Sequence, residues 1–284
     1  MLYNMKEILA VAKEHKFAIP AFNVADWSMF LGIMDECEAT NSPVIIEIHP
    51  DELAFEGPDM VGAIRQRALK SKVPVCIHLD HCSNFGTIIE AIQCGFTSVM
   101  FDGASLPFEE NIAGAKKVVE AAHPVNVSVE AELGTIGSTN PDDLEGGAAQ
   151  IIYTDPDDAV KFVEATGVDT LAVAIGTAHG FYVGTPVLDK ERLSEIREVV
   201  DIPLVLHGAS GLSDEDVMDC VKRGICKVNF ATELRAAYSK AVKDLLTEKP
   251  DTIDPKAYGK TAIAAVKELV MARMKVCGCD GKAE

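Results

Sequence analysis

The stretch VPVCIHLDHCSNFGTIIEAIQCGFTSVMF, residues 73–101, contains two short apolar runs separated by a segment with helical spacing. The runs are 73–79 and 97–101, and the helical segment is 85–94. Apolar residues at successive positions are typical of parallel strands that helices cover. A strand, a helix and a strand in this order predict a parallel pair joined by a helical crossover.

The same unit recurs along the whole chain. Eight strands are predicted, at 17–22, 43–49, 73–79, 97–101, 125–131, 169–175, 202–206 and 225–229. Helical spacing is found between them, at 28–39, 60–70, 85–94, 108–122, 156–166, 189–199 and 214–223. Eight units in 284 residues favour a closed barrel. We predict an α/β fold in which residues 1–284 form one (β/α)8 TIM-barrel domain, with an extra C-terminal helix at 258–275 after a helix at 232–247.

Composition and charge exclude several classes of function. The net charge of −18 argues against nucleic acid and anionic membranes as partners, because both bind basic surfaces. The N-terminal residues 1–16 have the pattern of an amphipathic helix and not of a signal peptide. The eight cysteines form no CxxC pair and are too few per residue for a disulfide scaffold, which favours reduced thiols. We predict a cytoplasmic protein that binds neither nucleic acid nor membrane.

Each predicted strand ends in or is directly followed by a polar or ionisable residue, and barrel enzymes place their chemistry at the C-terminal ends of strands. The residues at these ends are Asn23, Glu47, His49, Asp80, His81, Asp102, Glu130, Glu132, His179, His207 and Asn229. A single histidine at such a position is more often a surface residue, but the set as a whole favours a site. His81, His179 and His207 could occupy three positions on Zn²⁺ and leave one open. This requires the third strand to end near His81, since alternation otherwise puts His81 on the face opposite Asp80.

Two loops have the composition of phosphate sites. Gly208–Gly211 precedes a helix that Ser213 can cap, and Asn229–Thr232 opens another helix. One glycine-rich turn is as often a plain turn. Two such loops after strands seven and eight favour phosphate binding, because this is the usual phosphate site of the barrel.

Several motifs, in order, resemble the signatures of class II aldolases, with the tagatose-1,6-bisphosphate aldolase branch closest. They are Val75–Cys82, Ser98–Gly103, Leu106–Ile112, Val129–Gly134, Ala174–Gly180 and the His207 loop. The resemblance implies zinc-dependent, reversible cleavage of tagatose- or fructose-1,6-bisphosphate to dihydroxyacetone phosphate and glyceraldehyde 3-phosphate. It also implies a homodimer or homotetramer with a sugar phosphate as its small-molecule partner.

The resemblance also implies residue roles. His81, His179 and His207 would bind zinc, and Asp80 would move the proton. Asp102 and Glu132 match a second, non-catalytic metal site of some members, and a sodium or potassium ion helps hold the phosphate in this family. Arg235 matches a position that contacts the far phosphate. The remaining expected substrate contacts are Asn23, Gly180, Gly208, Ala209, Ser210, Asn229, Phe230, Ala231 and Thr232.

The chain departs from the family pattern at the substrate. Asn140 stands near the position of a loop glutamate, for which Asp142, Asp143 or Glu145 could substitute. His49 replaces a serine or threonine, and Val183 replaces a lysine. These changes leave three alternatives open: a class II aldolase for another phosphorylated keto-sugar or keto acid, a non-catalytic partner subunit of an aldolase, or a metal-dependent hydrolase. The complete zinc set disfavours the partner subunit, and the lack of a His-x-His at the first strand disfavours the hydrolase.

Overall fold

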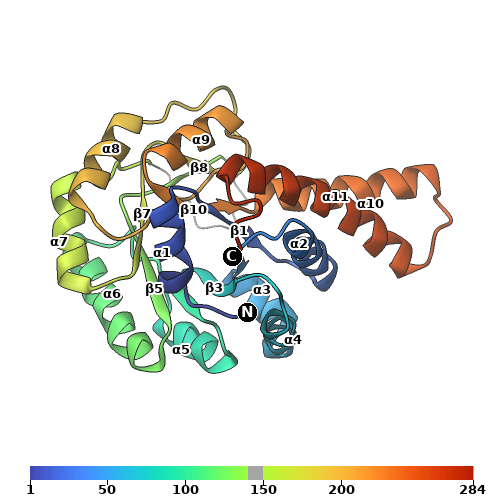
Figure 1. Ribbon diagram of the computed structural model, residues 1–284, viewed down its shortest axis with the longest axis horizontal. Coiled ribbons are helices and arrows are strands. Elements are labelled where there is room, and N and C mark those ends of the chain that lie inside the picture. Colours follow the sequence, from blue (N-terminus) through green and yellow to red (C-terminus); the bar gives the residue numbers. More distant parts are fainter. Residues whose placement is uncertain (140–149, 284) are drawn as a thin grey trace.

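The computed structural model describes residues 1–139 and 150–283, and it contains a closed barrel of eight parallel strands surrounded by helices (Figure 1). The strands neighbour one another in the order β1-β10-β9-β7-β5-β4-β3-β2, which closes the barrel between β1 and β2. Their bounds are β1 Ile19–Asn23, β2 Val44–Ile48, β3 Val75–Cys82, β4 Ser98–Phe101, β5 Ser128–Leu133, β7 Thr170–Val173, β9 Leu204–Leu206 and β10 Ile225–Phe230. The predicted (β/α)8 TIM barrel is confirmed.

Helices follow the strands around the outside of the barrel, as the apolar spacing predicts. They are α2 Trp27–Ala39, α3 Pro50–Glu56, α4 Pro58–Leu69, α5 Phe85–Cys94, α6 Phe108–Ala122, α7 Pro156–Thr166, α8 Lys190–Val199, α9 Asp214–Lys222 and α10 Thr232–Glu248. Polar side chains cap several N-termini, and Ser213 accepts from the backbone N–H of Asp216 at the start of α9. No helix within the described residues is long and apolar enough to cross a membrane.

The two ends of the chain complete the fold in different ways. Helix α1, Met5–His15, contacts β3, β5 and β10, and so covers the N-terminal end of the barrel. Helix α11, Pro255–Cys277, packs against α2 and runs beside α10, and the two helices project from the barrel (Figure 1). The expected extra C-terminal helix is therefore confirmed.

Three features differ from the predicted elements. Helix α3 was not predicted, because its seven residues are too few for an apolar period to show. A small parallel sheet of β6, Gly137–Ser138, and β8, Ala178–His179, lies outside the barrel. Strand β3 was expected to end at His81 but continues to Cys82, with a break in its pairing to β4 between Leu79 and Cys82.

Candidate metal centre and active site

Three histidines from separate segments meet at the C-terminal mouth of the barrel. His81 lies near the end of β3, His179 in β8, and His207 directly after β9. One ring nitrogen of each lies within 4.8 Å of the others. The three residues are 9%, 3% and 0% exposed, so water has little access to the rings. The structure thus brings together the three predicted metal ligands.

His81 reaches this cluster through an irregular backbone. Its φ angle is +42°, in the left-handed region that residues other than glycine seldom adopt. The residue lies within the break in register between β3 and β4. This break allows Asp80 and His81, which are neighbours in the chain, to face the same site despite the alternation of a regular strand.

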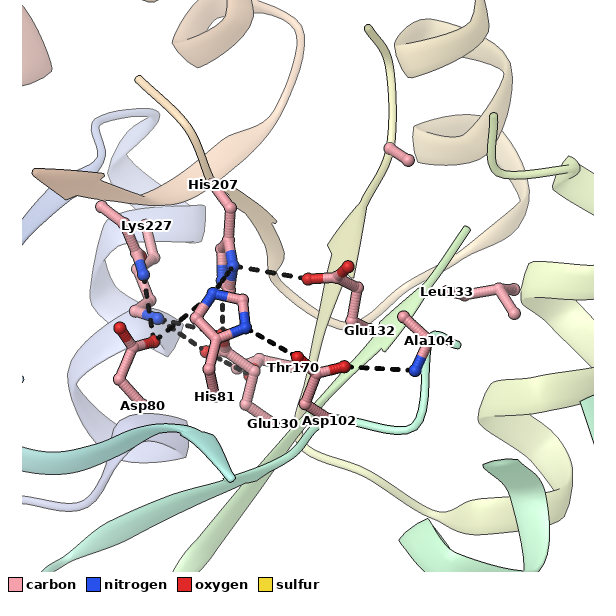
Figure 2. A network of polar contacts seen from close by, with 12 residues as sticks. Asp80, His81, Asp102, Ala104, Glu130, Glu132, Leu133, Thr170, His207 and Lys227 are labelled. Carbon is pink, nitrogen blue, oxygen red and sulfur yellow. Dashed lines mark hydrogen bonds and ion pairs between the residues drawn. The ribbon is translucent and has the colours of Figure 1, made fainter. Parts of the chain in front are cut away.

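Carboxylates hold the outer nitrogens of two of the imidazoles (Figure 2). Nδ1 of His81 lies 2.8 Å from Oδ2 of Asp102, and Nε2 of His207 lies 2.9 Å from Oε1 of Glu130. Each ring then donates from its outer nitrogen, and the carboxylate fixes both the tautomer and the ring orientation. The remaining nitrogens, Nε2 of His81 and Nδ1 of His207, lie 2.8 Å apart.

This donor set fits a metal cation. In the neutral tautomers that the carboxylates favour, the facing nitrogens of His81 and His207 both present lone pairs, so a cation or a proton must lie between them. Burial opposes the charged form of His81, but Asp80 and Asp102 outweigh it and raise the pKa of His81 well above its usual range. Three imidazoles with one open position are a common ligand set of catalytic Zn²⁺.

Asp80 lies beside the histidines with both carboxylate oxygens occupied. Oδ2 accepts from the Asn23 amide at 2.8 Å, and Oδ1 accepts from the Asn229 amide at 3.3 Å. The Asp80 side chain is buried, but the neighbouring His81 and Lys227 hold its pKa well below the usual range. Asp80 is thus an oriented, ionised carboxylate whose Oδ1 lies 4.0 Å from Nε2 of His81.

A charged cluster fills the barrel interior beneath the histidines. Nζ of Lys227 lies 2.8 Å from Oε1 of Glu47 and 3.0 Å from both carboxylate oxygens of Glu130, and all three residues are fully buried. Nδ1 of His78 lies 2.8 Å from Oγ of Ser98 on the adjacent strand. Through Glu130 this cluster is connected to His207. The role of Lys227 was missed from the sequence, although it stands two positions before Asn229 and so on the same face of β10.

The two residues of the expected second metal site also face the cluster. Asp102 accepts from His81 and, through Oδ1, from the backbone N–H of Ala104 at 3.1 Å. Oε2 of Glu132 lies 3.4 Å from Nδ1 of His207 (Figure 2). Burial, followed by the charge of Asp102, raises the pKa of Glu132 well above its usual value. A second cation here remains a prediction.

The two predicted phosphate loops lie at the same mouth. Gly208 has a φ of +67°, and a Cβ there would lie 2.7 Å from the carbonyl oxygen of Ala178, so only glycine fits. Tyr182, which was not predicted, accepts from the N–H of Ala178 and donates to the carbonyl of Gly208, and so joins the two histidine loops. At the start of α10, Oγ of Ser210 lies 3.4 Å from the backbone nitrogen of Glu233, so the two loops meet at the N-terminus of a helix, the end that favours an anion.

The other expected substrate residues occupy different positions around this mouth. A narrow cavity is lined by Asn23, Asp80, His81, His179, Gly180, Gly208, Ser210, Asn229 and Ala231. Phe230 is fully buried against Phe22, so only its backbone can face a ligand. Ala209 and Thr232 belong to the two loops, and Arg235 forms an ion pair with Glu52. Asp142, Asp143 and Asn140 lie outside the described residues, while Val183 is 98% exposed.

The chain is similar to known aldolases over nearly its whole length. A family model described as class-II fructose-bisphosphate aldolase matches residues 3–282. The structure of the YdjI aldolase from Escherichia coli K12 matches with a TM-score of 0.87 and 36% identity, over 100% of both chains. A putative fructose-1,6-bisphosphate aldolase from Coccidioides immitis matches with a TM-score of 0.90 and 29% identity, over 99% of this chain and 98% of that one. The fructose-bisphosphate aldolase of Campylobacter jejuni shares the fold at 21% identity and a TM-score of 0.80, over 99% of this chain and 97% of that one.

Proposed function

The chain belongs to the class-II fructose-bisphosphate aldolase family, and on this premise we propose that it is a zinc-dependent aldolase that reversibly cleaves a ketose 1,6-bisphosphate. The products would be dihydroxyacetone phosphate and glyceraldehyde 3-phosphate. The observation that carries the proposal is the meeting of His81, His179 and His207 beside the oriented carboxylate of Asp80.

The metal would be held by these three imidazoles. Bound Zn²⁺ supplies a Lewis acid that stabilises negative charge developing on the carbonyl oxygen of the substrate. Asp102 and Glu130 keep two of the rings in the tautomer that presents a lone pair to the site. Asp102 and Glu132 are retained as a candidate second metal site.

Asp80 would act as the general base. In the cleavage direction, the Asp80 carboxylate accepts the proton of the C4 hydroxyl, and the C4 oxygen becomes the carbonyl oxygen of the aldehyde. The C3–C4 bond breaks, and the electron pair of that bond passes into the dihydroxyacetone phosphate half as an enediolate. The amides of Asn23 and Asn229 aim both carboxylate oxygens, which removes the need to reorient them during the reaction. The enediolate then takes up one proton, for which Asp142 and Asp143 are the candidate donors.

The phosphate of the dihydroxyacetone half fits the loops at 208–211 and 229–232. Backbone N–H groups and the N-terminus of α10 suit an anion, despite the overall charge of −18. A sodium or potassium ion is proposed to assist there. We propose Arg235 as the contact of the far phosphate, because a guanidinium can bind phosphate with two parallel hydrogen bonds.

Tagatose-1,6-bisphosphate is the favoured sugar, with fructose-1,6-bisphosphate next. The alternatives are another phosphorylated keto-sugar or keto acid, and a non-catalytic partner role. A specific observation supports the first alternative, since His49 and Glu52 stand beside Arg235 where the aldehyde half would lie. The homodimer or homotetramer and the cytoplasmic location also remain proposals.

One experiment tests the function as a whole. The protein is incubated with tagatose- and fructose-1,6-bisphosphate, with a ketose 1-phosphate and with a phosphorylated keto acid, and the release of dihydroxyacetone phosphate is followed by a coupled enzyme. We expect turnover that a chelator abolishes and added Zn²⁺ restores. Zinc-loaded protein that releases no dihydroxyacetone phosphate from any of these substrates would contradict the proposed function.

A further inference from the structure

The ion pair between Arg235 and Glu52 crosses the rim of the active site. Nη2 of Arg235 lies 2.9 Å from Oε1 of Glu52, and the two side chains are only 23% and 13% exposed. Arg235 belongs to the first turn of α10, after β10, and Glu52 to the first turn of α3, after β2. Strand β1 lies between β10 and β2 in the barrel, so the pair bridges the end of β1.

This position is close to the reacting groups. The last residue of β1 is Asn23, whose amide donates to the base Asp80. Ala231 lines the active-site cavity, and its carbonyl accepts from the backbone N–H of Arg235 one helical turn later. A substrate that extends from the loops at 208–211 and 229–232 past Asp80 therefore approaches this rim with its aldehyde half.

The Glu52 carboxylate is held beside Arg235 by its surroundings. Its Oε2 atom is buried, accepts no hydrogen bond within the described part of the chain, and lies 3.8 Å from Nδ1 of His49. His49 caps the same helix by accepting from the N–H of Asp51. The carboxylate is thus confined between the guanidinium and the imidazole, where it cancels the charge with which Arg235 would attract a phosphate.

We infer that Glu52 is a specificity-determining residue that neutralises Arg235, lowers the preference for a phosphorylated aldehyde half, and admits ketose 1-phosphates whose far end is an uncharged polyhydroxy chain. The inference rests on the proposed aldolase activity and concerns the same site. A phosphate bound at Arg235 must approach a carboxylate of like charge that is only 13% exposed, and such juxtaposition is costly. A hydroxyl carries no such charge and can donate to Glu52.

The test compares kcat/KM for tagatose-1,6-bisphosphate and for tagatose 1-phosphate in the zinc-loaded enzyme. Glu52→Gln keeps the size of the side chain and removes its charge. Asp51→Asn is the matched control. It removes the same charge from the neighbouring residue, whose side chain is 71% exposed. Both changes are repeated in an Arg235→Met background, and thermal melting shows that each variant is folded.

We expect wild type to cleave both sugars, with values of kcat/KM within about tenfold of each other. Glu52→Gln should raise kcat/KM for the bisphosphate by about tenfold or more, mainly through KM, and change the 1-phosphate value by less than about threefold. Asp51→Asn should leave both values unchanged, and Arg235→Met should cancel the gain.

An unchanged ratio between the two sugars in Glu52→Gln, or an equal gain in Asp51→Asn, would overturn the inference. If neither sugar is cleaved, the result contradicts the proposed function and does not by itself test the role of Glu52. Calorimetric affinities for hexitol 1,6-bisphosphate and hexitol 1-phosphate in the same variants then still test Glu52, with the same direction expected.

Discussion

Nε2 of His81 and Nδ1 of His207 face each other at 2.8 Å, while Asp102 and Glu130 hold the opposite nitrogens of the two rings. Two lone pairs at this separation repel unless a cation or a proton lies between them. A metal ion bound by these two nitrogens would therefore compete with protons for them, as is general for histidine ligands.

The first prediction concerns zinc. We expect wild type to bind one Zn²⁺ tightly at the histidine cluster, and His179→Ala to lose metal and activity together, because two imidazoles hold zinc poorly. The measurement is metal content after dialysis against a weak chelator, with His15→Ala on the remote helix α1 as control. Full zinc occupancy in His179→Ala would refute the assignment.

Asp80 should affect catalysis and not metal binding. Asp80→Ala is expected to retain zinc and to bind substrate almost normally, yet to turn over at least about 10²-fold more slowly, since a positioned base contributes that much. Metal content and kcat are measured on the same sample. Loss of zinc from this variant would make Asp80 a ligand and the mechanism wrong.

Lys227 should be important for stability because its ammonium group lies between the buried carboxyl groups of Glu47 and Glu130. Lys227→Met leaves the buried carboxylate of Glu130 without its cation, and we expect a loss of about 3–5 kcal/mol in the free energy of unfolding. Lys240→Met is the control, since its ion pair with Asp244 is exposed and is expected to contribute at most about 1 kcal/mol. Urea denaturation measures the free energy of unfolding of both variants. Equal losses in Lys227→Met and Lys240→Met would contradict a special role of the interior ion pairs in stability.

The proton donor to the enediolate is predicted to be Asp142 or Asp143. Changing the responsible residue to alanine should slow exchange of the dihydroxyacetone phosphate proton with solvent more than it weakens binding. Exchange is followed by nuclear magnetic resonance in deuterated buffer, beside the dissociation constant. Wild-type exchange rates in both variants would leave the proton to water or to Glu145.

Sugar preference provides the last prediction. Ala231 lines the cavity where an aspartate could hydrogen-bond a substrate hydroxyl and sense its configuration. We therefore expect tagatose-1,6-bisphosphate to be cleaved at least as well as fructose-1,6-bisphosphate, and Ala231→Asp to shift the kcat/KM ratio towards fructose. The ratio is measured under identical zinc loading. A strong wild-type preference for fructose, or no shift in the variant, would contradict this role.

The sequence by itself determined the barrel and placed the candidate reacting groups at strand ends. Eight apolar runs alternating with helical spacing have few stable arrangements other than closure, because each strand must be covered by helices and no edge left open. The positions of Asp80, His81, His179 and His207 at strand ends could be predicted for the same reason, since parallel strands direct their C-terminal ends to one mouth.

Only the tertiary structure decided which groups meet around these residues. Local periodicity could not show that His81 adopts a φ of +42°, because the break in β3 depends on its pairing with β4. Neither could it join Lys227 to Glu130, 97 positions earlier, or Arg235 to Glu52, 183 positions earlier. Charges so far apart in the chain interact only after barrel closure excludes water and fixes their distances, so the partners of each charge are a property of the fold.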